Sequence, residues 1–172
     1  MDVVERQWRL EACEHESKHA GLLHAYGVHV TRVGVCADGS GETTYNPLDD
    51  RDLADTLRWE PYRVAQRLVM VYMAGCYAGG IGTREPLCDG DARMLAHYGA
   101  VWTRVRGSDT CQPSAATLQA KARAMAHRWV IEHEEAITRF ARQLDSAGSL
   151  SGSQLQQRLE RVFGHRGVVH AV

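Results

Sequence analysis

The apolar residues in the first part of the chain recur at the spacing of a helix. The segment from Asp2 to Tyr26 contains no proline, and its only glycine is Gly21. The residues that set the helical period are Trp8, Ala12, Cys13, Ala20 and Leu23. This pattern predicts one helix from about Val4 to Ala25, with Gly27 ending it.

The period then changes to that of a strand. Val28–Val35 is rich in β-branched residues and partly alternates between apolar and polar positions, and Glu42–Tyr45 resumes this pattern. The glycine-rich segment Ala37–Gly41 lies between them. Strand, turn and strand in this order predict an antiparallel hairpin. Asn46–Asp50 then breaks the pattern.

Four further segments are predicted as helices, because their apolar residues recur with helical period between breaks rich in glycine and proline. They are Tyr62–Ala78, Asp91–Val105, Ala115–Leu144 and Gln154–Phe163. Ser114 is the expected N-cap of the long third segment, and Ala147–Ser149 is the expected turn before the last. We therefore expect one domain over residues 1–172, mainly α with a small β-hairpin or sheet (α+β). Residues 164–172 would form a flexible tail.

Composition narrows the class of protein. The chain has 172 residues, 44% of them hydrophobic, and a formal net charge of -1. This length can bury a core, and the balanced charge gives no argument for a nucleic-acid partner or an anionic membrane. The N-terminus lacks the apolar region of a signal peptide. No cysteine pair has CxxC spacing, which favours reduced thiols and a cytoplasmic protein. The five cysteines are Cys13, Cys36, Cys76, Cys88 and Cys111.

The sequence His15-Glu16-Ser17-Lys18-His19 has the form HExxH and lies within the first predicted helix. Histidines four residues apart share one helix face, where both imidazoles can bind one zinc ion. Glu16 is rotated by about 100° from His15, so it can lie beside the metal and take a proton from the attacking water. This motif predicts a zinc (Zn2+) site with His15 and His19 as ligands.

The two residues inside the motif carry expectations of their own. Ser17 falls about opposite the two histidines, where a small residue can face the core. Lys18 lies at the flank of the metal-facing side, and we expect its stem to carry the ammonium out to solvent.

A third protein ligand is needed to leave the fourth zinc position for water. The motif is not followed by the extension HExxHxxGxxH, so this ligand must come from elsewhere in the chain. The candidates by residue type are Asp89, Asp91, Asp109, Glu134 and Glu135. Spacing alone does not choose among them.

The order of these motifs resembles the peptidase domain of FtsH, a family of ATP-dependent zinc proteases. The family's helix reads roughly HEAGHA, and His15–Ala20 reads HESKHA here. Softer matches follow in the same order along nearly the whole chain. They are the β segment Val28–Tyr45, the small-residue helix end Tyr72–Gly80, the aspartate-led segment Asp89–Ala96, the long-helix segment His133–Leu144 and the short helix Gly152–Leu159.

The resemblance implies a zincin-like helical fold and a zinc metalloendopeptidase. It makes His15 and His19 metal ligands, Glu16 the general base, and Asp91 the third ligand. Asp109, which also precedes a predicted helix, is the alternative third ligand. The family's peptidase domains assemble into rings, so a homo-oligomer is left open.

The chain departs from the family in three ways, the first being that Lys18 stands where the family's motif has a glycine. The fourteen residues before His15 leave no room for the ATPase module or the membrane anchor, and Gly79-Gly80 stands where the family has an acidic pair. One hypothesis is therefore a stand-alone zinc metallopeptidase that acts on peptides or unfolded protein segments. The alternative is a catalytically inactive relative that serves as a protein-binding or regulatory module.

Overall fold

The computed structural model describes residues 3–46, 61–75, 89–107, 111 and 113–167. The chain divides into two compact units, one made of Met1–Leu48 with His133–Val172 and the other of Asp49–Glu132. The expectation of a single domain stays a prediction. The predicted mainly helical fold with a small antiparallel sheet is confirmed.

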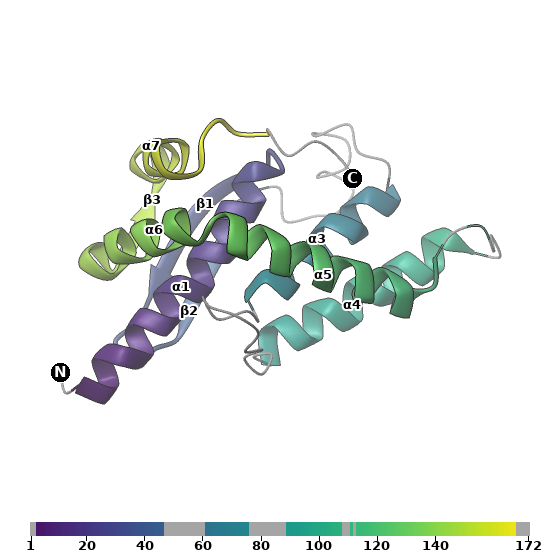
Figure 1. Ribbon diagram of the computed structural model, residues 1–172, viewed down its shortest axis with the longest axis horizontal. Helices are drawn as coiled ribbons and strands as arrows, with labels where there is room; N and C mark the ends of the chain where they lie inside the picture. Colours follow the sequence, from purple (N-terminus) through teal and green to yellow (C-terminus); the bar gives the residue numbers. More distant parts are fainter. Residues whose placement is uncertain (1–2, 47–60, 76–88, 108–110, 112, 168–172) are drawn as a thin grey trace. The chain divides into compact units, whose positions relative to one another are not determined.

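Helix α1 (Val3–Ala25) is the central element of the first unit and confirms the first predicted helix. It contacts the sheet, α6 (Glu134–Ala147) and α7 (Gly152–Phe163) (Figure 1). Gly27 ends it with a positive φ of 83°, a conformation that favours glycine, and donates its N–H to the His24 carbonyl at 2.9 Å.

The sheet has three antiparallel strands in the order β2-β1-β3. They are β1 (His29–Val35), β2 (Gly41–Asn46) and β3 (Ser149–Ser151). The predicted hairpin is confirmed, with Val33 opposite Thr43. The backbone N–H and side-chain hydroxyl of Ser40 both donate to Asp38, which closes the turn between β1 and β2.

Strand β3 overlaps the end of the segment predicted as a turn. Gly148 ends α6 with a φ of 72°, and the chain then runs straight into three residues that pair with β1. Leu150 in this strand is 1% exposed and lies opposite Val33. A strand this short carries too few residues for a period of two to be recognised in the sequence.

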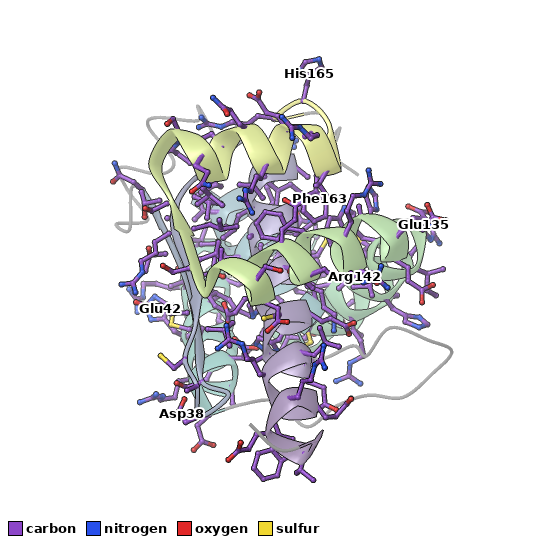
Figure 2. The ribbon with its side chains drawn as sticks, turned by 90° about the vertical axis from the view of Figure 1, so that its left-hand side faces the viewer. Asp38, Glu42, Glu135, Arg142, Phe163 and His165 are labelled. Atoms are coloured by element: carbon purple, nitrogen blue, oxygen red, sulfur yellow. The ribbon has the colours of Figure 1, made fainter. Side chains whose placement is uncertain are left out.

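The core of the first unit gathers one apolar face from each element. On α7, the buried apolar positions follow the helical period, and the helix contacts α6, β1 and α1. Figure 2 shows Phe163 between α7 and α6, and its ring is 5.8 Å from that of Phe140. The core side chains exposed by no more than 1% include Leu22, Leu23, Val30, Val33, Phe140, Leu144, Leu150, Leu155 and Leu159. Burying each leucine or valine stabilises the fold by about 1.5–3 kcal/mol.

The long helix predicted over Ala115–Leu144 is wrong as one element. The structure has α5 (Ala115–Glu132) in the second unit and α6 in the first, with His133 between them at φ −115° and ψ 17°. These angles are not helical, and His133 acts as the N-cap of α6. Neither proline nor glycine marks the break, so the sequence carries no local signal for it.

The second unit packs α3 (Pro61–Gly75) against α4 (Asp89–Arg106) and α5. The predicted N-cap of α5 is confirmed, because the Thr117 N–H donates to the Ser114 hydroxyl at 3.2 Å. The Trp102 indole N–H donates to the Pro113 carbonyl at 2.8 Å. The predicted end of the helix at Ala78 and the pair Gly79-Gly80 lie outside the described residues. The buried side chains of this unit include Val64, Leu68, Leu95, Tyr98, Trp102, Leu118 and Trp129.

The chain after α7 turns back onto the C-terminal end of α1. Within the predicted tail, Arg166 donates to the Gly27 carbonyl at 2.8 Å, and Gly167 donates to the His24 carbonyl at 3.2 Å. Residues 168–172 lie outside the described part of the chain. Among the helices that the structure describes, none combines the length and the apolar character needed to cross a membrane.

Candidate metal centre

Helix α1 brings the two histidines of the HExxH motif together. The Nε2 atoms of His15 and His19 are 2.9 Å apart, and the ring centroids lie 4.6 Å apart with planes at 78°. The expectation that both imidazoles share one helix face is confirmed. The separation of the two Nε2 atoms is within hydrogen-bond distance, and the tautomers of the two rings decide which nitrogen donates and which accepts.

The distance between these nitrogens can be compared with the needs of a zinc ion. Two ligands at the usual Zn–N distance in a tetrahedral site have nitrogens roughly 3.3 Å apart. The observed 2.9 Å differs by only a few tenths of an ångström, which small side-chain rotations can supply. Two imidazoles are also ligands that zinc accepts readily. The donor pair therefore fits a zinc ion in both geometry and chemistry.

Glu16 lies between the two histidines in sequence and is held by the sheet. Its side chain is 6% exposed, and its Oε2 accepts a hydrogen bond of 2.5 Å from the Thr43 hydroxyl of β2. Such a short bond to a carboxylate is a strong, charge-assisted one. The sequence reasoning did not find Thr43 as part of the site, because it lies 27 residues away from Glu16.

Ser17 faces the core, as the helical period predicted. It is completely buried, and its hydroxyl donates to the Cys13 carbonyl one turn earlier at 2.6 Å. This bond satisfies the hydroxyl without a partner from another element. Cys13 is a free thiol whose pKa is raised to about 11, chiefly because it is buried.

The expectation that Lys18 reaches solvent is wrong, because its side chain is only 1% exposed. All residues of α1 from Glu16 to Ala25 are buried, since the helix is contacted by β1, β2, α6 and α7. A helix covered on several sides has no flank along which a lysine stem can lead outward. The buried ammonium is thus a feature of the motif's surroundings.

The candidates for a third ligand lie in different parts of the fold. Asp91 stands in the first turn of α4, in the second unit, and is 5% exposed; its role as a metal ligand stays a prediction. Asp89, which opens α4, is exposed. Asp109 lies outside the described residues.

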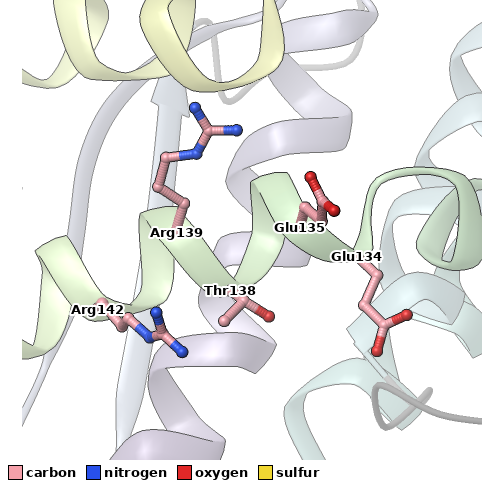
Figure 3. A pocket seen from close by; sticks show the side chains of 5 residues that line it. All are labelled: Glu134, Glu135, Thr138, Arg139 and Arg142. Carbon is pink, nitrogen blue, oxygen red and sulfur yellow. The ribbon is translucent and has the colours of Figure 1, made fainter.

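Glu134 and Glu135, the other two candidates, are exposed on α6. They line a shallow surface pocket together with Thr138, Arg139 and Arg142 (Figure 3). Within the described part of the chain, neither glutamate belongs to a group of ligand atoms with the two histidines. Their position is that of charged side chains on a solvated helix face.

No family model matches this chain, and none of the curated proteins searched matches it.

Proposed function

We propose that this protein is a zinc-dependent metallopeptidase that hydrolyses peptide bonds in peptides or unfolded protein segments. The observation that carries the proposal is the pair of Nε2 atoms, 2.9 Å apart on α1, with the buried Glu16 carboxylate beside them in sequence. Metal-assisted hydrolysis uses such a combination, with the two imidazoles as metal ligands and the carboxylate as general base.

The metal ligands and the glutamate have different tasks in the proposed reaction. His15 and His19 would bind the metal, and Asp91 would be the third ligand, as the resemblance to the FtsH peptidase domain implies. When bound, zinc supplies a Lewis acid that makes water acidic and polarises a carbonyl. Glu16 would take a proton from the attacking water while the oxygen of that water bonds to the carbonyl carbon. It would then pass that proton to the leaving nitrogen as the C–N bond breaks.

The sheet offers an edge on which an extended peptide can lie. The Val35 N–H bonds to Gly148 on the β3 side, whereas the Cys36 N–H bonds to Ser40 on the β2 side. The N–H and C=O groups of successive residues in a strand point to opposite sides. Val33 and Val35 therefore bond toward β3, and their partners on β2, Thr43 and Gly41, point their own N–H and C=O groups away from β1. Within the described residues, β2 pairs with β1 alone. An added peptide strand would bind there and run beside Glu16.

The wider fold of the proposed peptidase would be zincin-like and similar to the FtsH peptidase domain. The HExxH helix, the hairpin that follows it and the later helices occur in the order that this likeness requires. Peptides and unfolded protein segments are the proposed substrates, because an extended chain can pair with the edge of a sheet.

The test measures zinc and peptide cleavage separately. Purified protein is expected to hold about one zinc per chain and to cleave a fluorogenic peptide library. His15→Ala should lose both properties, while Glu16→Gln should keep the zinc and lose about 100-fold or more in kcat. The matched controls, His165→Ala and Glu135→Gln, change exposed residues of the same types (Figure 2) and should retain both. Cleavage by Glu16→Gln at the wild-type rate would refute the proposed function.

Lys18 favours the alternative, a catalytically inactive protein-binding module, because it places a buried cationic residue inside the HExxH motif. Like charges disfavour the binding of a divalent cation nearby. The alternative predicts protein without zinc that cleaves no peptide even when zinc is supplied. Stoichiometric zinc with cleavage would exclude it.

A further inference from the structure

Two residues of β2 lie against the side chain of Glu16. Gly41 and Thr43 are two positions apart, so they share one face of the strand, and both contact Glu16. Glu42, between them, points outward and is exposed (Figure 2). At this point the face of β2 that meets α1 therefore consists of Gly41, which has no side chain, and the hydroxyl of Thr43.

Thr43 binds one oxygen of the carboxylate. Its hydroxyl is 2.5 Å from Glu16 Oε2 and 3.4 Å from the Glu16 backbone carbonyl. A hydroxyl has a single proton, and the shorter distance assigns that proton to Oε2. Thr43 thus fixes the rotation of the carboxyl group and leaves Oε1 free of this bond.

Gly41 supplies the space that the other oxygen occupies. A Cβ at this position would lie 2.6 Å from Glu16 Cγ, 2.6 Å from Oε1 and 2.9 Å from Cδ. These distances are far below van der Waals contact, and they involve the stem of the glutamate as well as its end. The φ of Gly41 is not in the left-handed region, so room for Glu16, and not backbone conformation, is what requires glycine here.

We infer that Gly41 and Thr43 are positioning residues which hold the Glu16 carboxylate in place, with Oε1 as the oxygen that accepts the proton. The inference rests on the proposed function, in which Glu16 is the general base. A misplacement of a catalytic group by about 1 Å can cost about 100-fold in rate. Neither residue needs to touch substrate with its side chain for this effect, so substrate affinity should change little.

The first test removes the hydroxyl of Thr43. Thr43→Val keeps the shape of the side chain and should lower kcat by about tenfold to 100-fold, with KM and zinc content unchanged. Thr43→Ser restores the hydroxyl and should return kcat to near the wild-type value. Thr31→Val is the matched control, because the Thr31 hydroxyl bonds across the same two strands to Thr44, 3.0 Å away. It should leave kcat unchanged.

The second readout needs neither metal nor activity. In zinc-free protein, the carboxyl carbon of Glu16 gives an NMR resonance that Glu16→Gln identifies. Thr43→Val should shift this resonance, whereas Thr43→Ser and Thr31→Val should leave it in place. If the wild-type protein cleaves no peptide, the proposed function fails, and the resonance still decides whether Thr43 holds Glu16. An unshifted resonance in Thr43→Val, or a Thr43→Ser variant as slow as Thr43→Val, would overturn the inference.

Gly41→Ala tests the other half of the arrangement. The added methyl group should displace Glu16, shift the same resonance and lower kcat by about tenfold or more, without loss of zinc. Gly34→Ala is its control on β1, since a Cβ there would meet its nearest neighbour, the Cβ of Ser149, at an ordinary 3.4 Å. A Gly41→Ala protein with wild-type kcat and resonance would show that Glu16 is not confined by β2.

Discussion

Strand β3 lends itself to a quantitative test because a single buried side chain anchors it. Leu150 is 1% exposed and lies opposite Val33 on β1. Leu150→Ala removes three carbon atoms, worth about 0.8 kcal/mol each on transfer from water, or roughly 2.4 kcal/mol. The cavity left in a packed core brings the expected loss in the free energy of unfolding to about 3–4 kcal/mol.

Urea denaturation followed by far-ultraviolet circular dichroism measures this loss, and the midpoint should fall while the slope stays constant. Ser149→Ala is the control, because Ser149 is exposed in the same strand and its change should stay within about 0.5 kcal/mol. A loss below about 1 kcal/mol in Leu150→Ala would contradict the packing described for β3. It would mean that the surroundings do not enclose this side chain as a core leucine.

Three further predictions concern side chains of the first unit. Burial lowers the pKa of His24 below its ordinary 6.5, so the unfolded chain binds a proton at this residue more readily than the folded chain does. The free energy of unfolding should therefore fall as the pH drops below about 6.5. In His24→Gln, the decline in urea midpoint between about pH 7 and pH 5 should be smaller than in the wild type; an equal decline would assign it to other groups. Burial raises the pKa of Cys13 to about 11, so iodoacetamide at neutral pH should label the exposed Cys36 much faster than Cys13. Mass spectrometry of the labelled peptides measures both rates, and equal rates would contradict the burial of Cys13. Arg9→Ala removes two hydrogen bonds to Asp145, of 2.7 and 2.8 Å. Because the pair is half-buried, urea denaturation should show a loss of about 1 kcal/mol in the free energy of unfolding. An unchanged free energy of unfolding would mean that this ion pair contributes nothing to stability.

The elements predicted correctly from the sequence are those specified by local patterns. Helix α1 follows from its apolar period and from Gly27, and the hairpin follows from two alternating segments around a glycine-rich turn. The break at His133 and strand β3 have no such signal. Both depend on contacts between segments more than 100 residues apart, since β3 exists only by pairing with β1 and α6 packs on α1.

The site divides in the same way between local and distant information. The spacing of His15 and His19 settles their common face, because one turn of helix is enough to bring the imidazoles together. Lys18 was mispredicted because the sequence does not say how many elements surround α1. Thr43 was missed because its role depends on the strand that returns beside the helix.

This difference bears on what an HExxH motif means. Two histidines and a glutamate on a helix can occur by chance, and their spacing alone does not fix the glutamate, whose three side-chain torsions leave the carboxylate many orientations. Here a strand distant in sequence restricts those orientations from two directions, with a hydroxyl on Oε2 and a bare glycine beside Oε1. A solvent-exposed glutamate of a chance motif has no need of either residue. A loss of kcat without loss of zinc on adding one methyl group at Gly41 would therefore separate a carboxylate positioned for chemistry from one that is only packed against β2.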